Sequence, residues 1–279
     1  MSQVWLITGA SRGLGRAIAI AALEAGHSVA ATTRSGVLDD VDPRFSDRLL
    51  VLPLDVTAPD EQVYSSVVES VTERFGRIDV LVNNAGHGIL VCFEETDDAQ
   101  VRELFETNVF GLMRVTRAVL PVMRQQRSGH IFNLSSLAGY VGGNAMYSAT
   151  KFAVTGFTES LAFELSPFGI KATNVGPGYF RTDFLDSSSI TDRPANELAD
   201  YKASREQIRS FAEQANHQQA GDPAALGRLL VEVAASEHPP VHLPVGADCI
   251  EAVEQHQSSL ASDVDAWRDK SVATAHETA

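Results

Sequence analysis

Features that would point to several other kinds of function are scarce in this 279-residue sequence. It contains no run of 18 apolar residues, so we expect no membrane-spanning helix. Cysteine occurs only as the isolated Cys92 and Cys249, which suits a reducing compartment, and the eight histidines lack the spacing of metal ligands. We therefore expect no metal site. The chain runs directly into a strand without a basic leader, which predicts a cytoplasmic protein.

Positive charge is also scarce. There are 22 lysines and arginines against 36 aspartates and glutamates, giving a net charge of −14. An acidic protein is repelled by phosphate backbones and anionic lipids, so we expect neither nucleic acid nor a membrane surface as partner. Apolar residues, in contrast, are present in ordinary amount at 44%. The chain is long enough for one large domain with a well-buried core.

Short apolar runs alternate with helical segments along most of the chain. Strands are predicted near residues 3–8, 28–33, 49–54, 78–82, 130–135, 170–175 and 241–245, and helices near 14–25, 59–75, 97–126, 146–166 and 222–236. The strands are continuously apolar, as expected when helices cover both faces of a sheet. We predict an α/β fold with a doubly wound, mostly parallel, seven-stranded Rossmann-like sheet.

Two segments depart from this rhythm. Residues 181–221 form a long polar insertion within a single domain over 1–249, and a loop of that length is usually functional. Residues 250–279 form a C-terminal helical extension and tail, with an apolar stripe made of Ile250, Val253, Leu260, Val264 and Trp267. We expect the stripe to pack back on the domain, with a subunit contact as the alternative.

A glycine-rich turn follows the first predicted strand. Gly9, Gly13 and Gly15 stand between that strand and an alanine-rich helix. Glycines allow close approach of a backbone to a pyrophosphate, and the start of a helix offers free N–H groups to an anion. The pattern therefore predicts dinucleotide binding. The alternative is a turn that merely requires positive φ angles.

Tyr147 and Lys151 lie four residues apart in a predicted helix and therefore share one face of it. An ammonium group there favours the phenolate and should lower the pKa of the phenol from its ordinary value of about 10. Such a phenol can exchange a proton with an alcohol oxygen near neutral pH. Ser135, twelve residues upstream, ends a predicted strand and has Ser136 as its neighbour.

Together these segments resemble the short-chain dehydrogenase/reductase family, in its compact single-domain branch. The resemblance covers roughly residues 3–250 and rests on Thr8-Gly-Ala-Ser-Arg-Gly-Leu-Gly15, Asp55-Val56, Asn83-Asn-Ala-Gly86, Asn108, Ser135, Tyr147-Ser-Ala-Thr-Lys151 and Pro177-Gly178, in the family's order. It implies an enzyme that interconverts a ketone or aldehyde and an alcohol, similar to carbonyl reductases and to hydroxysteroid or retinol dehydrogenases.

The resemblance also implies roles for four residues. Tyr147 would be the general acid, and Lys151 would lower its pKa and bind the nicotinamide ribose. Ser135 would polarise the substrate oxygen. Asn108 would hold a water that links Lys151 to solvent.

Charges near the second strand bear on the choice of cofactor. Arg34 stands where NAD-selective enzymes usually carry an acidic residue, and Arg12 adds a second cation in the glycine turn. Two guanidinium groups suit a 2′-phosphate, so we predict NADP(H) in preference to NAD(H). The residues expected to bind the cofactor are Gly9, Ser11, Arg12, Gly13, Leu14, Gly15, Arg34, Asp55, Val56, Asn83, Ala85, Gly86, Tyr147, Lys151, Pro177, Gly178, Phe180 and Thr182.

The expected substrate is a small hydrophobic carbonyl compound or alcohol. The residues predicted to line its pocket are mainly apolar: Ile89, Leu90, Val141, Met146, Tyr179, Phe180 and Phe184, with His87 and Asn144 as polar groups. Apolar faces on the helices over 97–126 and 146–166 predict a homodimer or homotetramer. Two alternatives to the predicted carbonyl–alcohol activity remain: a non-catalytic NADP(H)-binding regulator, and an epimerase or dehydratase of the extended branch.

Overall fold

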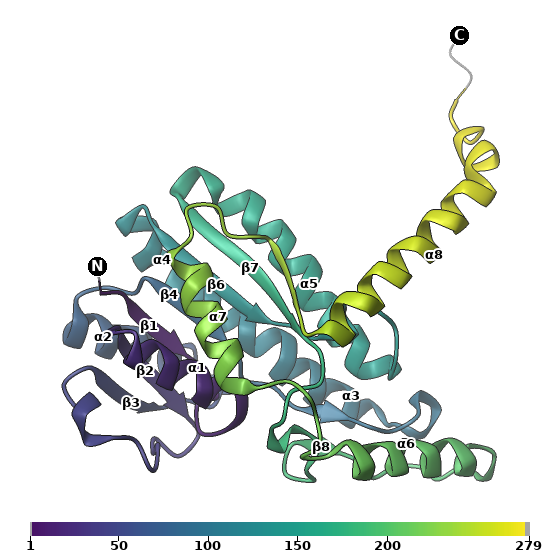
Figure 1. The fold of residues 1–279 in the computed structure, drawn as a ribbon, viewed down its shortest axis with the longest axis horizontal. Helices are drawn as coiled ribbons and strands as arrows, with labels where there is room; N and C mark the ends of the chain where they lie inside the picture. The colour runs from purple at the N-terminus through teal and green to yellow at the C-terminus, as the bar shows by residue number, and fades with distance from the viewer. Residues whose placement is uncertain (1, 277–279) are drawn as a thin grey trace.

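The computed structural model describes residues 2–276, built around one seven-stranded parallel sheet (Figure 1). Its strands are, in spatial order, β3 (Leu49–Pro53), β2 (Ser28–Thr33), β1 (Val4–Ile7), β4 (Val80–Asn83), β6 (Gly129–Leu134), β7 (Ile170–Pro177) and β9 (His242–Val245). Every pairing between neighbours is parallel. The predicted fold class is thereby confirmed.

Helices cover both faces of the sheet because side chains along each strand alternate between them. On β1, Trp5 and Ile7 pack with α1 (Gly13–Glu24) and α7 (Pro223–Ala235). Leu6 faces the opposite layer. That layer contains α2 (Glu61–Phe75), α4 (Leu112–Gln126) and α5 (Ala145–Leu165). The two layers account for the continuously apolar strands of the sequence.

The helix predicted over 97–126 is interrupted. It begins as α3 (Asp98–Phe105), which a reciprocal capping box between Asp97 and Gln100 starts. A π-helical stretch, Glu106–Gly111, follows before α4 begins. Single π-helical turns inside longer helices are frequent at functional sites, and this one contains Asn108.

The insertion after β7 forms a separate layer over one end of the sheet. It contains the short turn Asp183–Leu185, then β8 (Ile190–Thr191), which pairs in parallel with β5 (Gly88–Ile89), and then α6 (Lys202–Ala215). In Figure 1, α6 lies along the lower edge of the molecule, away from the main sheet. The insertion is therefore attached to the domain through β5, through backbone hydrogen bonds to Glu95, and through side-chain contacts such as those of Arg12 and Arg205.

The C-terminal extension does not pack back on the domain, so that prediction is wrong. Helix α8 (Ala247–Val272) points away from the body beyond its first turns (Figure 1), and only Cys249 of its residues is buried. The helix contains neither glycine nor proline and continues straight for about 39 Å. Residues 277–279 of the predicted tail lie outside the described residues. Within residues 2–276, no helix is both long and apolar enough to cross a bilayer.

Candidate active site

The predicted site residues gather at the carboxyl ends of β1, β4, β6 and β7, where open parallel sheets bind ligands. The glycine turn after β1 has left-handed backbone at Gly9 (φ 64°) and Gly13 (φ 58°). A Cβ on Gly9 would stand 2.9 Å from the Cα of Ala85. A Cβ on Gly15 would overlap the Asn84 amide. These glycines are therefore required by conformation and space, and they leave the helix start open.

Asn84 and Thr8 fix the shape of this turn. The Asn84 amide donates to the carbonyl oxygens of Thr8 and Gly9, both at 3.0 Å. The Thr8 hydroxyl accepts from the backbone N–H groups of Asn84 and Ala85. The sequence prediction named Ala85 but missed Asn84 and Thr8. For Asn84, the only signal in the sequence was the doubled asparagine, Asn83-Asn84.

The Asn83 side chain lies in the core, so the predicted contact of this residue with the cofactor would have to be made by its backbone. Its amide donates to the Thr116 hydroxyl at 2.9 Å and to the Asn133 oxygen at 2.8 Å. Asn133 in turn donates to Thr158. This buried chain of polar groups ties β4 and β6 to α4 and α5, so Asn83 has a structural function.

Tyr147 and Lys151 lie in the first two turns of α5, which the Asn144 side chain caps by accepting from the Tyr147 N–H. The Lys151 ammonium is buried, donates to the Leu134 carbonyl at 2.9 Å, and lies 5.6 Å from the centre of the Tyr147 ring. The cap and the strand end thus fix the pair at the end of β6.

The two neighbouring serines after β6 point in opposite directions. The Ser135 hydroxyl is buried under α5, 3.0 Å from the Lys151 carbonyl oxygen and 3.2 Å from the Thr155 hydroxyl. Ser136 is in extended conformation, so its side chain lies on the other side, where it accepts from the Ala138 N–H at 3.1 Å and is near enough to Tyr147 to lower the pKa of the phenol. Ser136 therefore replaces Ser135 as the hydroxyl beside the phenol.

Burial dominates the electrostatics of the pair. It raises the pKa of Tyr147 to about 12, against an opposing effect of the hydrogen bond with Ser136. It lowers the pKa of Lys151 to about 8. The predicted lowering of the tyrosine pKa by the lysine is therefore not seen. The reason is geometric, since the lysine hydrogen bonds the Leu134 carbonyl while the phenol is desolvated.

Asn108 connects three elements from within the π-helical stretch. Its side-chain oxygen accepts from the His87 N–H at 3.0 Å, and its amide donates to the His87 carbonyl at 2.9 Å and to Thr150 at 3.2 Å. Asn108 thus holds the backbone after β4 against the start of α5. The same contacts place the Gly86–His87 backbone beside α5.

The two predicted cofactor cations have different surroundings. Arg34 is exposed at the end of β2, close enough to Asp55 that its charge helps to lower the pKa of that carboxyl, after the hydrogen bonds from Thr57. Arg12 points to the insertion instead. It donates to the Ser188 hydroxyl at 2.6 Å and the Ser189 hydroxyl at 2.7 Å.

The chain after β7 passes close to the glycine turn. Thr182 lies against Gly13, and its hydroxyl accepts from the Phe184 N–H. Asp248, from the first turn of α8, accepts from the Tyr179 N–H at 2.7 Å and fills the space beside Gly178. Asp248 was missed by the sequence analysis, and it explains how the base of α8 is fixed to this loop.

Comparison with known proteins places the chain in a family. The profile described as short chain dehydrogenase matches residues 3–193. The chain is a short-chain dehydrogenase. It is 38% identical to the oxidoreductase BOA17 of Botryotinia fuckeliana, covering 99% of this chain and 100% of that one. It is 37% identical to a 3-ketodihydrosphingosine reductase of Bacteroides thetaiotaomicron, covering 88% of each. A solved short-chain dehydrogenase of Streptomyces avermitilis matches 99% of this chain and 100% of that one, with 39% identity and a TM-score of 0.88.

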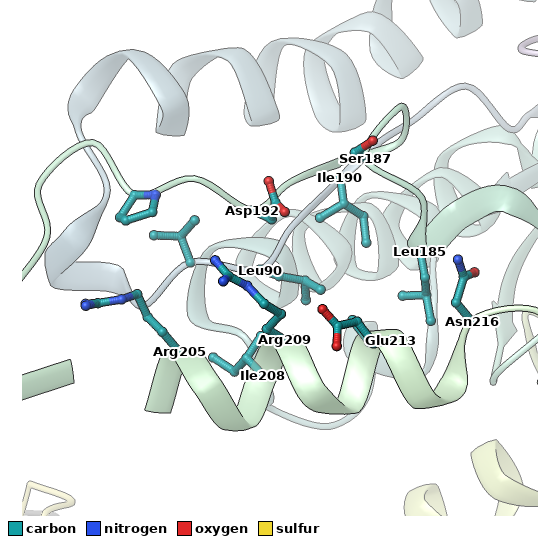
Figure 2. Close-up of a pocket in the computed structure, with 13 residues that line it drawn as sticks. Leu90, Leu185, Ser187, Ile190, Asp192, Arg205, Ile208, Arg209, Glu213 and Asn216 are labelled. Carbon is teal, nitrogen blue, oxygen red and sulfur yellow. The ribbon is translucent and has the colours of Figure 1, made fainter. Parts of the chain in front are cut away.

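In this short-chain dehydrogenase, a cavity of about 340 Å³ lies between α6 and the β5–β8 pair (Figure 2). Leu90, Leu185, Ile190 and Ile208 supply apolar walls, and Arg209 and Glu213 add charge. Phe184, beside Leu185, lies 5.8 Å from the Tyr147 ring between ring centres. The cavity thus adjoins the residues around Tyr147.

Only part of the predicted substrate pocket lines this cavity. Leu90 does, but Ile89 and Met146 pack in a small core with Leu104. The Asn144 side chain is used as a cap and as a donor to the Val91 carbonyl. The wall from α6 was missed, because the sequence does not indicate which face of the insertion turns inward.

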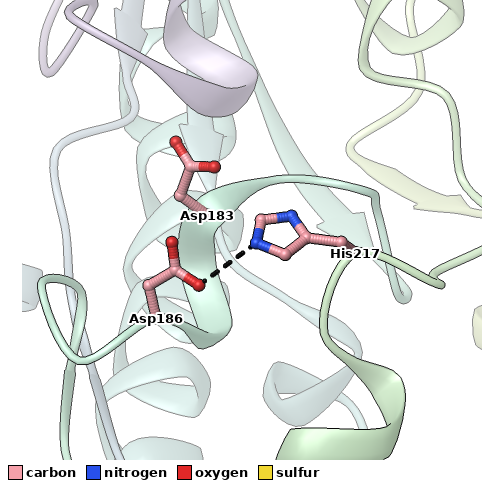
Figure 3. Close-up of side chains that lie close together, drawn as sticks. All are labelled: Asp183, Asp186 and His217. Carbon is pink, nitrogen blue, oxygen red and sulfur yellow. Dashed lines mark ion pairs between the residues drawn. The ribbon is translucent and has the colours of Figure 1, made fainter.

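Asp183, Asp186 and His217 meet at the outer edge of the insertion (Figure 3). His217 lies 3.3 Å from Asp186, which also accepts from the Asn216 amide at 2.6 Å. These contacts join the turn after β7 to the end of α6. Since Asp186 and His217 are far apart in the chain and carry no local pattern, this contact could not be predicted from the sequence.

Proposed function

We propose that this short-chain dehydrogenase is an NADP(H)-dependent enzyme that interconverts a hydrophobic ketone or aldehyde and its alcohol. The family makes it an oxidoreductase with a nicotinamide cofactor. The observation that carries the finer proposal is the grouping of Tyr147, Ser136 and Lys151 at the end of β6, beside the glycine turn.

The glycine turn fits a dinucleotide. Positive φ at Gly9 and Gly13 turns the backbone back on itself, and the missing side chain at Gly15 keeps the start of α1 accessible to a pyrophosphate. Arg34 and Arg12 would hold the 2′-phosphate, Arg12 after releasing the two serines of the insertion. When bound, NADPH supplies the hydride that reduces the carbonyl carbon.

Side chains of the protein protonate the substrate carbonyl oxygen and stabilise the negative charge that develops on it. The Tyr147 phenol, neutral because its pKa is about 12, donates its proton to the substrate oxygen as negative charge develops there. Ser136 donates a hydrogen bond to the same oxygen and stabilises that charge. Lys151, within one turn of Tyr147, stabilises the resulting phenolate and returns a proton to it, and the neutral amine then regains a proton from solvent.

The substrate preference is supported by the cavity under α6. Leu90, Leu185, Ile190 and Ile208 give it an apolar wall, while Asp192 after β8 and Arg209 and Glu213 of α6 add charge elsewhere in the lining. An apolar chain attached to the carbonyl would therefore be desolvated there. The relative described as a 3-ketodihydrosphingosine reductase is consistent with such a substrate. We propose a cytoplasmic reaction that runs as a reduction, because cytoplasmic NADP is kept reduced.

The test is a screen of NADPH oxidation against ketones and aldehydes with alkyl chains of increasing length. We expect kcat/KM to rise with chain length, and Tyr147→Phe to lower kcat by at least about a hundredfold while leaving NADPH affinity nearly unchanged. Near wild-type turnover by Tyr147→Phe would refute the assigned acid. Turnover that is indifferent to chain length would refute only the substrate class.

A further inference from the structure

Helix α8 carries an apolar stripe that no other part of residues 2–276 covers. Ile250, Leu260, Val264 and Trp267 are 45%, 55%, 48% and 60% exposed, respectively. The helix contacts the body near its base, against β9, the turn at Leu137–Gly139 and the Tyr179 backbone. Beyond these contacts it extends away from the domain (Figure 1). A stripe of this length on an isolated helix indicates a missing partner.

The spacing of the stripe identifies what kind of surface fits it. Successive members are separated by three, four, three, four and three residues: Ile250, Val253, Gln257, Leu260, Val264 and Trp267. This is the 3.5-residue repeat of a coiled-coil seam, which stays aligned with one facing helix. A helix that packs on a globular core usually carries a wider apolar face. The stripe therefore fits another helix.

The charges of α8 exclude two other occupants. The helix carries six carboxylates against two cations, Arg268 and Lys270. Helices that lie on anionic membranes have a polar face rich in lysine and arginine, so this helix would be repelled from such a surface. Nucleic acid is disfavoured for the same reason. A second copy of the chain, in contrast, supplies a helix of equal length with the same repeat.

We infer that α8 pairs in antiparallel orientation with α8 of a second copy. The layers of this pair are Ile250 against Trp267 of the partner subunit, Val253 against Val264 of the partner subunit, and Gln257 against Leu260 of the partner subunit. Antiparallel pairing puts the two bodies at opposite ends of the seam. Parallel pairing would bring both bodies to the same end, where each helix leaves its domain.

The flanking residues of this register are compatible with the pairing. His256 comes to lie beside Asp263 of the partner subunit, and Glu254 beside Ala261 of the partner subunit, so carboxylates do not face one another at these positions. The seam from Ile250 to Trp267 is about 27 Å long. Its buried area is on the order of 1,000 Å², near the lower limit for a specific interface, so dilution should dissociate the pair.

Leu260→Glu tests the pairing, with Ser262→Glu as the matched control. Both variants add one carboxylate to the same turn, but position 262 lies opposite the seam. In light scattering and sedimentation at micromolar concentration, Leu260→Glu should halve the number of chains per particle and Ser262→Glu should not change it. Thermal unfolding of both variants checks that the domain remains folded. A wild-type protein that is already a single chain, or an unchanged particle for Leu260→Glu, would overturn the inference.

Orientation is tested by oxidative cross-linking. An equal mixture of Gln257→Cys and Leu260→Cys proteins, diluted and reconcentrated to exchange chains, should cross-link several-fold more than Leu260→Cys alone. Parallel pairing would reverse this order, because it brings position 260 against itself. Wild type under the same oxidation controls for Cys92 and Cys249, of which Cys249 is buried. The reversed order would overturn the antiparallel register.

Discussion

The strand ends that hold the proposed catalytic residues and the insertion that follows β7 are fixed by different kinds of contact. Around α5, the polar groups are buried and bonded within the core, as with Asn108 to Thr150 and Ser135 to Thr155. No residue of α6 is buried. The insertion is fastened instead by contacts along its exposed loops, including Arg12 with Ser188 and Ser189 and backbone hydrogen bonds from residues 195 and 196 to the Glu95 carbonyl.

The strongest fastening of the insertion is the ion pair between Glu95 and Arg205. Glu95 is fully buried, and its carboxylate also accepts from the Leu198 N–H at 2.9 Å. Removing either partner would leave a buried charge, which makes this contact harder to break than the exposed ones. The geometry around Tyr147 is therefore set by the core, whereas the exposed insertion can adjust its position around the buried Glu95–Arg205 attachment.

The largest effect on catalysis is expected from replacing the serines after β6 with alanine, one at a time. Ser136→Ala should lower kcat/KM by about a hundredfold, because it removes the hydroxyl beside Tyr147 that stabilises charge on the substrate oxygen. Ser135→Ala should leave kcat within a few-fold of wild type but destabilise the fold by about 1–2 kcal/mol, since its hydrogen bonds are buried. Kinetics and denaturant unfolding of both variants separate the two outcomes. The opposite pattern would return the catalytic role to Ser135.

Arg12 lies in the glycine turn and contacts the insertion, so replacing it should affect both cofactor binding and the attachment of the insertion. Arg12→Ala and Arg34→Ala should each weaken NADPH about ten- to a hundredfold and barely change NADH. Arg34→Asp should reverse the preference, because a carboxylate repels the phosphate and accepts from free ribose hydroxyls. Only Arg12→Ala should also speed proteolysis between 181 and 221, since it alone releases Ser188 and Ser189.

The check is kcat/KM for both cofactors together with limited proteolysis of the unliganded proteins. Variants that all keep the wild-type NADPH/NADH ratio would exclude a phosphate site at these arginines. Equal proteolysis of Arg12→Ala and Arg34→Ala would show that the serine contacts do not restrain the insertion.

A smaller effect is expected on the free energy of unfolding, through the buried Lys151. Burial lowers the pKa of Lys151 from 10.5 in the unfolded chain to about 8, so the folded protein binds fewer protons between these values. Wild-type stability should therefore rise with pH in that window relative to Lys151→Met, by about 1 kcal/mol per pH unit. Below pH 8 the cost of the buried cation is fully present, and the difference should be constant. Urea unfolding from pH 7 to pH 10 measures this difference in the free energy of unfolding. If the free energies of the two proteins change equally with pH, the low lysine pKa is refuted.

Much of this molecule could be predicted from local patterns. Continuous apolar runs indicated the parallel sheet, because strands covered on both faces have no polar side. The glycine turn was recognisable because left-handed backbone and close approach both require the absence of a Cβ, as at Gly9. The Tyr147–Lys151 pair was found because a helix places residues four apart on one face. Each of these signals depends on neighbours within a few positions.

Other features were decided only by the tertiary structure. Whether Ser135 or Ser136 faces Tyr147 depends on the backbone after β6, where successive extended residues alternate sides, so an error of one position reverses the assignment. The side chains of Asn83 and Asn84 also point in different directions, that of Asn83 into the core and that of Asn84 to the glycine turn. The stripe on α8 was visible in the sequence, but its direction was not. Periodicity fixes which face of a helix is apolar, whereas the contacts at the helix base, through Asp248 and Tyr179, fix where that face points.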